Sequence, residues 1–516
     1  MQKLKKEKNI LSAVSPVMII MILSRLLSLL SVQIYMAHYG VSNEYLNIYS
    51  YVISVPNIIF TCIGTALSTV VIPIYVGHKA LGRESDAKKF ADNIITISLV
   101  FTLALVIIGF LISPILPKFT AFAKDEKLYS FTVKALMIVF PVMFFYALNY
   151  IFQGMLQAVG RYKLPAFVSV PSSLIVIAYT LLLGDKFGIP GLLVATVIGL
   201  AMQALILIPP LVKDGYRYGI SFEIKHPDIV KAAKMTVPVL LGVGAYQLNM
   251  LYNVTMIARF EGMVTLLTYV QNITLYMVLA LIFSVTAVIY PKLSESASKG
   301  NMEEYKTTLS GVLASISVLL IPMTFGFTGV RKSLLTLLAG WGQITEGDID
   351  KAAILLAAYS IGIIGIGLKE ILDRGLYSLG NTKISAITGL IIMIVNVSVS
   401  LVLMKIVGAY GIPLAYSFAS LIGMGVLLFA IKKKVGTYAK GLGLTVLKSI
   451  VASLIMLFVV DLLNRFLPDS KELTMRMIKL FIPVVAGIGV YVIMAFVLKI
   501  SPVTQVIFKF LKRGNK

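Results

Sequence analysis

The sequence predicts an all-α polytopic membrane protein with fourteen transmembrane helices, built from two parallel six-helix repeats and a C-terminal helix pair. Three observations lead to this fold class. The 516 residues are 58% hydrophobic and 13% charged, with a mean hydropathy of +0.92, whereas roughly a quarter of the residues of a soluble protein are charged. Charges are concentrated between long apolar runs. Segments of the first half of the chain also recur in the second half.

The apolar runs have the length that a bilayer requires. A hydrocarbon core about 30 Å thick needs about 20 helical residues. The first run follows a basic stretch, as in a signal peptide, but it continues past Arg25 to about Ala37 without a small-residue cleavage site, so we expect a retained span. The predicted spans centre on residues 11–37, 46–77, 93–117, 129–158, 166–184, 190–212, 235–258, 263–291, 308–330, 353–379, 384–407, 411–431, 447–466 and 477–498.

The positions of Lys and Arg predict the topology, because cytoplasmic loops carry an excess of basic residues. If the N-terminus is cytoplasmic, most of the 46 Lys and Arg residues lie on that side, in clusters at 3–8, 79–89, 213–234, 432–448 and 509–516. Acidic residues such as Asp185 and Asp348 lie on the other side. We expect both termini in the cytoplasm. The net charge of +23 is then a topology signal, and we expect no nucleic-acid partner.

An internal duplication organises the first twelve spans. The stretch VIPIYVGHKALGRESDAKKF matches VIYPKLSESASKGNMEEYKTT, with Gly82 aligned on Gly300, and GMLQAVGRYKLPA matches GLYSLGNTKISA. The match predicts lobes at residues 1–225 and 226–440, followed by an added segment at 441–516. Six spans per lobe give both lobes the same orientation, as in transporters that bind substrate between two repeats and alternate access to it.

The sequence contains no recognisable catalytic motif and no set of metal ligands. The chain contains no P-loop, zinc-protease motif or serine-hydrolase motif. Its only cysteine, Cys62, excludes an intrachain disulfide, and His38, His78 and His226 are too scattered to indicate a metal site. We therefore expect a protein that is not an enzyme and that has no cofactor, metal or catalytic residue.

Arg25 is a candidate binding residue because it lies in the middle of the first span. A central Arg facing lipid costs roughly 2.5–3.5 kcal/mol on insertion scales. No acidic residue shares its helix, so it needs an anionic ligand or a partner on another helix. Both interpretations remain open.

A second candidate is the charged stretch that ends span ten. Lys369, Glu370, Asp373 and Arg374 follow an uncharged run, and the 100° helical step places them within one arc. Lys369 with Asp373 and Glu370 with Arg374 are i,i+4 pairs, so the group is also explained as a self-paired helix end. Arg374 is the better candidate for an anion because its guanidinium can bind phosphate bidentately.

Uncharged polar residues at membrane depth complete the candidate site. Hydrogen bonding between helices and lining of a cavity explain them equally well. The candidates are Asn57, Asn149, Gln153, Gln247 and Asn272.

Several stretches resemble the mouse-virulence-factor family of lipid II flippases, within the multidrug/oligosaccharidyl-lipid/polysaccharide exporter superfamily. They are SRLLSLL, VPNIIF, ALSTVVIPIY, GVGAYQLNMLYN, YPKLSESASKGNMEEY and LDRGLYSLGNTK. The resemblance implies a V-shaped pair of lobes around a cationic cavity, with Arg25 and Arg374 among the cavity cations and spans 13 and 14 forming a groove for a polyprenyl tail. Departures from the family pattern are Ser31, Val32, Gly64, Asn253, Asn272 and Ser400.

The resemblance implies a flippase for an undecaprenyl-pyrophosphate-linked saccharide. We expect lipid II to be the substrate, moved from the inner to the outer leaflet of the bacterial plasma membrane for peptidoglycan synthesis, with cell-wall synthesis proteins as further partners. Three alternatives stay open: a flippase for a capsule or spore-envelope oligosaccharide, a cation-coupled multidrug exporter, and a non-transporting scaffold for envelope synthesis.

Overall fold

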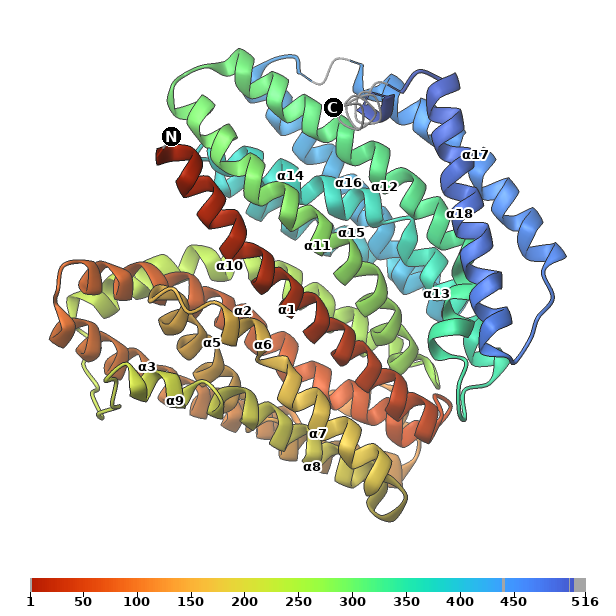
Figure 1. Ribbon diagram of the computed structural model, residues 1–516. Helices are drawn as coiled ribbons and strands as arrows, with labels where there is room; N and C mark the ends of the chain where they lie inside the picture. Colours follow the sequence, from red (N-terminus) through yellow and green to blue (C-terminus); the bar gives the residue numbers. More distant parts are fainter. Residues whose placement is uncertain (1, 439–440, 501, 505–516) are drawn as a thin grey trace. The chain divides into compact units, whose positions relative to one another are not determined.

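The computed structural model describes residues 2–438, 441–500 and 502–504, and all the regular secondary structure in these ranges is helical (Figure 1). The predicted all-α class is confirmed. Part of the basic topology signal, namely Lys440, Lys509, Lys512, Arg513 and Lys516, lies outside the described residues.

Eleven helical segments of the described chain are long and apolar enough to cross a membrane. One of them, Thr382–Val435, contains two helices joined by a short 3-10 turn. Two further helices, α10 and α11, have 31 and 36 residues. The chain is therefore a multi-span membrane protein, and the count of fourteen spans stays a prediction.

The first compact unit comprises Met1–Thr265. Its α2 packs against α5 and α10, and an apolar core joins α2, α3 and α5 through residues such as Tyr75, Phe90 and Leu156. Its helices are α1 (Gln2–Tyr39), α2 (Glu44–Ala80), α3 (Glu84–Ile112), α4 (Glu126–Val139), α5 (Val142–Ala158), α6 (Lys163–Phe167), α7 (Ser169–Leu182), α8 (Gly184–Leu205), α9 (Ile208–Lys213) and α10 (Pro227–Ile257).

The second compact unit comprises Leu266–Lys516. One apolar core includes Tyr305 and Leu372, and another lies among α12, α17 and α18 around Met456 and Tyr491. Its helices are α11 (Met263–Ser298), α12 (Met302–Ala339), α13 (Glu346–Ser360), α14 (Ile363–Ser378), α15 (Thr382–Val407), α16 (Gly411–Val435), α17 (Leu442–Phe466) and α18 (Leu473–Val497).

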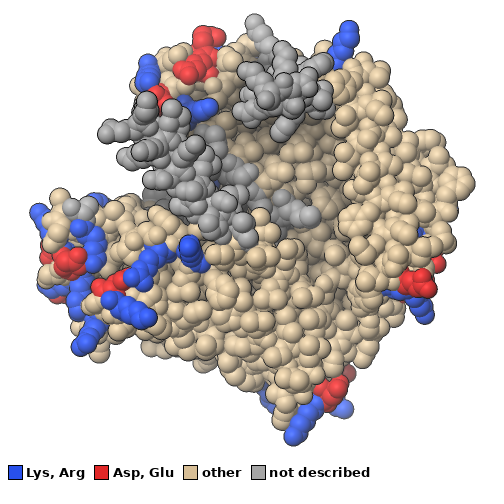
Figure 2. Space-filling model, in the orientation of Figure 1, with Lys and Arg blue, Asp and Glu red and all other residues tan. Residues whose placement is uncertain are grey.

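The surface has the distribution of charge that a lipid-facing protein needs. On the face drawn in Figure 2, acidic and basic side chains gather in a few groups, and broad areas between them carry none. Large apolar side chains such as Leu182, Ile406, Phe429 and Val485 are exposed. In water such surfaces would be an aggregation hazard, whereas in a bilayer they are solvated by acyl chains.

The turns that the sequence duplication aligns have the same local geometry. Gly82, Gly300, Gly160 and Gly380 all have φ between 70° and 78°, a region that glycine adopts without steric cost. At each turn the glycine N–H donates to the carbonyl three residues earlier, and the next N–H donates to the carbonyl five residues earlier. This is the Schellman pattern that ends a helix.

Packing and duplication divide the chain at different places. α10 lies beside α2 in the first unit, which extends to Thr265, whereas the repeat assigns residues 227–257 to the second lobe. The lobes at 1–225 and 226–440 describe how the sequence repeats, and they stay a prediction.

Spans four and ten are among the predicted spans that are interrupted helices. Span four divides into α4 and α5 at Pro141, because proline has no N–H to donate to the preceding turn. Span ten divides into α13 and α14 without a proline. There the Ser417 hydroxyl donates to the carbonyl of Ala358 at 2.6 Å, and the Ser420 hydroxyl donates to that of Gly362 at 3.3 Å. Side chains of α16 thus satisfy carbonyls beside the break.

The crossing of α14 and α16 gives a test of this packing. A Cβ at Gly365 would lie 2.7 Å from the backbone nitrogen of Leu421, whereas a Cβ at Gly425 would meet nothing within 4 Å. We expect Gly365→Ala to lower the free energy of unfolding by about 1–3 kcal/mol through overpacking. Gly425→Ala should leave it unchanged or raise it slightly, because alanine is the better helix former. Unfolding midpoints of the two purified variants check this, and equal midpoints would contradict the close crossing.

Candidate functional site

Arg25 is placed by the packing of α1 on α6 and α7. The hydroxyl of buried Ser24 donates to the carbonyl of Ala166 at 3.1 Å, and the hydroxyls of Ser28 and Ser173 lie 3.1 Å apart. These two serines define the packed face of α1. Arg25 is one helical step away from Ser24, and its side chain is exposed. The seryl contacts therefore direct the guanidinium away from the packed face.

Two of the predicted amides belong to a hydrogen-bonded chain inside the first unit. The Gln153 amide donates to the Asn149 carbonyl oxygen at 3.0 Å, and the Asn149 amide donates to Gln203 at 3.4 Å. The Gln203 amide then donates to the Ser172 hydroxyl at 2.7 Å. The chain links α5, α8 and α7, so bonding between helices describes at least part of what Asn149 and Gln153 do.

The other predicted amides are dispersed. Asn57 is exposed on α2, where its side-chain oxygen accepts a hydrogen bond from Thr61 at 3.4 Å. Gln247 on α10 and Asn272 on α11 are half-buried. Beside Asn272, the Gln271 amide donates to the Tyr359 hydroxyl. The Asn57 contact lies within α2, and the Gln271 contact joins α11 to α13. Neither contact brings the candidates into one cluster within either unit.

The charged stretch of α14 is partly neutralised within its own helix, as predicted. Lys369 Nζ lies 2.6 Å from Asp373 Oδ2, and the two side chains are 24% and 6% exposed. This i,i+4 pair is confirmed. The other carboxylate oxygen, Asp373 Oδ1, is buried and accepts no hydrogen bond from any described residue. A buried carboxylate oxygen retains a strong tendency to attract a donor, which makes this side of α14 polar.

The second predicted pair of this stretch, Glu370 with Arg374, is not at contact distance, although the charge of Arg374 still acts on Glu370. Among the described residues Glu370 and Arg374 form no ion pair, and the Arg374 guanidinium instead lies over the ring of Tyr377, 5.8 Å from its centroid. The ring face attracts the cation without occupying its N–H groups. Arg374 therefore retains donors that can bind an anionic oxygen, and its charge is not cancelled by Glu370 at contact distance.

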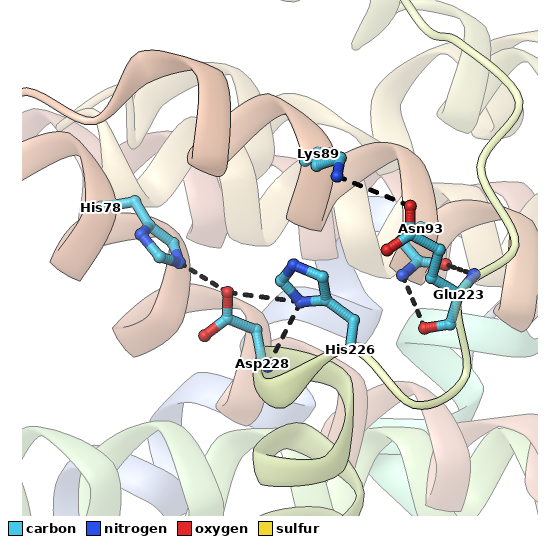
Figure 3. A network of polar contacts seen from close by, with 6 residues as sticks. All are labelled: His78, Lys89, Asn93, Glu223, His226 and Asp228. Atoms are coloured by element: carbon cyan, nitrogen blue, oxygen red, sulfur yellow. Dashed lines mark hydrogen bonds and ion pairs between the residues drawn. The ribbon is translucent and has the colours of Figure 1, made fainter.

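A cluster that sequence reasoning missed joins the ends of α2 and α10 (Figure 3). His78 Nε2 lies 2.9 Å from Asp228 Oδ2, and His226 Nδ1 accepts a hydrogen bond from the Asp228 backbone N–H at 3.3 Å. An ionised carboxylate oxygen only accepts, so His78 is the donor in the 2.9 Å contact, and His226 Nδ1 lies 3.7 Å from the same oxygen. The interpretation of the histidines as scattered is wrong for His78 and His226. Even so, no group of three His, Cys, Asp or Glu side chains in the described ranges is arranged to hold a metal ion.

The same end of the first unit holds the segment between α9 and α10 against α3. The Asn93 amide donates to the Glu223 carbonyl at 2.9 Å and accepts from the Glu223 N–H at 2.7 Å (Figure 3). The Tyr216 hydroxyl donates to Asp92 Oδ1 at 2.8 Å. Burial, followed by this hydrogen bond, raises the pKa of the Tyr216 phenol. The phenol therefore stays a donor, and no sequence spacing links these residues, which lie more than 120 positions apart.

Comparison with known proteins decides the family. A family model described as lipid II flippase MurJ matches residues 36–468. The chain belongs to the MurJ family. It is 24% identical over 446 residues to a probable lipid II flippase MurJ of Rickettsia prowazekii, covering 84% of this chain and 87% of the relative. The identity to the probable lipid II flippase MurJ of Bdellovibrio bacteriovorus is also 24%, over 88% of each chain.

Solved structures show the same fold. A lipid II flippase MurJ in an inward closed conformation matches with a TM-score of 0.76 and 22% identity, over 93% of this chain and 97% of that one. An inward-facing multidrug resistance transporter of the MATE family matches with a TM-score of 0.64 and 15% identity, over 80% of this chain and 94% of that one. The MurJ fold therefore extends over nearly the whole chain.

One departure from the MurJ family pattern has a steric explanation. Gly64 is one of the named departures. Here a Cβ at Gly64 would lie 2.1 Å from Cδ2 of Tyr150, and Tyr150 lies beside buried Phe60, with ring centroids 6.4 Å apart. The aromatic ring occupies the space that a larger side chain at position 64 would need. The glycine at position 64 is therefore part of the packing of α2 on α5.

The His78–Asp228 contact can be tested against its exposed neighbour. The two side chains are 15% and 21% exposed, so we expect Asp228→Asn to lower the free energy of unfolding by about 1.5–3 kcal/mol, the range for hydrogen bonds to charged groups. The matched control is Lys89→Gln. Lys89 and Glu223 are 3.6 Å apart and about half exposed, so this variant should unfold like the wild type. Unfolding midpoints decide, and equal losses in both variants would contradict the assignment.

Proposed function

We propose that this chain is a flippase that moves lipid II from the inner to the outer leaflet of the bacterial plasma membrane and so supplies peptidoglycan synthesis. The observation that carries the proposal is the MurJ family match over residues 36–468. The likeness of the fold to a lipid II flippase over 93% of the chain supports it. We also propose that the protein is not an enzyme: it changes the position of its substrate and not its covalent structure.

Arg25 and Arg374 are the residues that we propose to hold the diphosphate. Each guanidinium presents N–H groups in a fixed fork that matches phosphate oxygens. Arg25 is exposed beside the packed face of α1, and Arg374 retains its donors over Tyr377. Lys369, Glu370, Asn57, Asn149, Gln153, Gln247 and Asn272 complete the proposed substrate-binding set, through hydrogen bonds to the sugar and peptide groups.

The architecture that we propose for transport has two parallel six-helix lobes, at residues 1–225 and 226–440, and a helix pair at 441–516. The eleven candidate spans support fourteen crossings, because one of them holds both α15 and α16, and α10 and α11 add two more. Such repeats move substrate by rocking against one another. The interruptions between α4 and α5 and between α13 and α14 are positions where a span can bend without losing hydrogen bonds.

Both termini are proposed to lie in the cytoplasm, which labelling can test. In a Cys62→Ser background, a membrane-impermeant maleimide added to intact cells should label Lys186→Cys, in the connection between spans five and six, and should not label Thr437→Cys until the cells are opened. Both positions are exposed, so accessibility differs only by membrane side. Labelling of Thr437→Cys in intact cells would reverse the topology.

A complementation experiment tests the transport function. Cells depleted of their own lipid II flippase should grow when this chain is expressed, and outer-leaflet lipid II should return. Arg25→Ala or Arg374→Ala should abolish both, because losing hydrogen bonds to a charged group costs about 1.5–3 kcal/mol per bond, and the bound diphosphate would be left poorly neutralised. Membrane levels of each variant are measured in parallel.

The control variant is Arg83→Ala, since Arg83 is exposed at the start of α3 and lies outside the candidate set. It should complement fully. Normal growth with Arg25→Ala and Arg374→Ala would remove the binding role of the two arginines. Failure of the correctly inserted wild-type chain to restore lipid II would favour a different lipid-linked oligosaccharide as substrate.

A further inference from the structure

A polar cavity lies within the second unit, where the end of α12 meets the connection between α17 and α18. Its volume is about 250 Å³. It is separate from the charged stretch of α14, because none of the residues that line it belongs to α13, α14, α15 or α16. Neither the family match nor the proposed diphosphate site gives it a role.

The cavity carries an excess of positive charge. Five basic side chains and two acidic ones line it, namely Arg331, Lys332, Arg465, Arg476, Lys479, Asp461 and Asp469. Three of the basic residues have carboxylate partners: Arg465 lies 2.8 Å from Asp461, Lys479 lies 2.6 Å from Asp469, and Lys332 lies 2.7 Å from Asp350. With Asp350 included, the local group retains two more positive charges than negative ones.

The two remaining cations, Arg331 and Arg476, contact only neutral groups among the described residues. The Arg331 guanidinium donates to the carbonyl of Thr328. The Arg476 guanidinium donates to the carbonyl of Gly340 at 2.5 Å and lies over the ring of Trp341, 4.8 Å from its centroid. A carbonyl holds the Arg331 guanidinium in place, and a carbonyl together with a ring holds that of Arg476. None of these neutral groups cancels the positive charge.

The helices that line the cavity are closely packed against one another. A Cβ at Gly329 would lie 2.9 Å from a methyl group of Val460, and a Cβ at Gly487 would lie 2.9 Å from the other methyl group of the same residue. α17 is therefore packed closely against both α12 and α18. The Asn464 amide donates to the Gly329 carbonyl at 3.0 Å, and Ser333 Oγ donates to Asn464 Oδ1 at 3.2 Å. This bonding fixes the spacing of the cavity walls.

Lipid-facing surface adjoins the cavity. Phe466 at the end of α17 is 78% exposed, and on α18 Phe481 and Val485 are 51% and 66% exposed. Trp341, which contacts Arg476, is half exposed, and tryptophan is enriched at the level of lipid headgroups. The cavity thus combines uncompensated cations with apolar helix faces that continue into the bilayer. A molecule that matches both has an anionic head and a hydrocarbon chain.

We propose that this cavity binds the phosphate group of an anionic lipid, with Arg331 and Arg476 as its ligands. The volume accommodates a phosphate and several water molecules, since water occupies about 30 Å³ in the liquid. The phosphate can come from a phospholipid or from a polyprenyl phosphate, which share this chemistry. The cavity lies at the opposite membrane face from the connection between α16 and α17, so the outer leaflet follows from the proposed topology, whereas binding itself does not depend on it.

Native mass spectrometry of the full-length protein released from detergent tests this proposal, with phosphatidylglycerol, phosphatidylcholine and a polyprenyl phosphate as the added lipids. We expect the wild type to retain an anionic lipid in preference to phosphatidylcholine. Arg331→Gln and Arg476→Gln should each weaken that retention about tenfold, the lower range for a hydrogen bond to a charged group. The matched control is Lys351→Gln, because Lys351 is exposed at the same membrane face but does not line the cavity.

The lipid that the variants lose distinguishes a phospholipid from a polyprenyl phosphate as the source of the bound phosphate. Stronger loss of phosphatidylglycerol identifies a phospholipid site, and stronger loss of the polyprenyl phosphate identifies a site for a substrate-related lipid. Arg476→Lys, which keeps the charge, should retain more lipid than Arg476→Gln and controls for misfolding. Equal retention by wild type, Arg331→Gln and Arg476→Gln, or equal loss with Lys351→Gln, would overturn the proposal. Failed complementation with intact lipid binding would refute lipid II as the substrate and leave this site standing.

Discussion

Polar groups at membrane depth must find their partners inside the protein, because hydrocarbon offers no hydrogen bonds. The break between α13 and α14 illustrates the constraint: hydroxyls of Ser417 and Ser420 on α16 donate to carbonyls beside the interruption. The close approach of α16 at Gly365 is what brings the two hydroxyls within reach. An interrupted span thus depends on its neighbour, and that dependence couples the shape of one helix to the position of the next.

The same constraint sorts the ionisable residues of the spans. Lys369 and Asp373 neutralise one another within a single turn of α14, although the second carboxylate oxygen of Asp373 is buried without a donor among the described residues. Arg374 lies over Tyr377 and forms no contact ion pair with Glu370, so its charge is only partly balanced within the helix. A cation retained at such a position is costly unless it serves an anion. This contrast within four residues makes Arg374 the member of the stretch with the chemistry that a diphosphate requires.

Polar and charged groups outside the hydrocarbon have two other roles. At the ends of α2, α3 and α10 they join chain segments: His78 contacts Asp228, and Asn93 clamps the backbone of Glu223. Near the end of α12 they surround a cavity and leave Arg331 and Arg476 without carboxylate partners. The first arrangement holds a connection in place, whereas the second leaves charge available to a ligand. Both arrangements lie near helix ends, where water can hydrogen-bond to charged groups that have no protein partner.

The all-α class and the polytopic character were determined by composition and by the length of the apolar runs. A bilayer requires a minimum number of apolar residues per helix, and that number can be counted along the sequence. The Lys369–Asp373 pair also followed from the sequence, because residues four apart are neighbours on a helix. The contact of Arg374 with Tyr377, the amide chain from Gln153 to Ser172 and the approach of His78 to Asp228 were decided only by tertiary structure. The packing of helices far apart in the chain sets the links from Asn149 to Gln203 and from His78 to Asp228. A rotamer choice sets the contact of Arg374 with Tyr377, which i,i+3 spacing permits but does not select over Glu370. The contact of Gly64 with Tyr150 was also decided only by tertiary structure. The sequence shows a glycine in a span, but only the packing shows that the Tyr150 ring fills the space where a Cβ would lie.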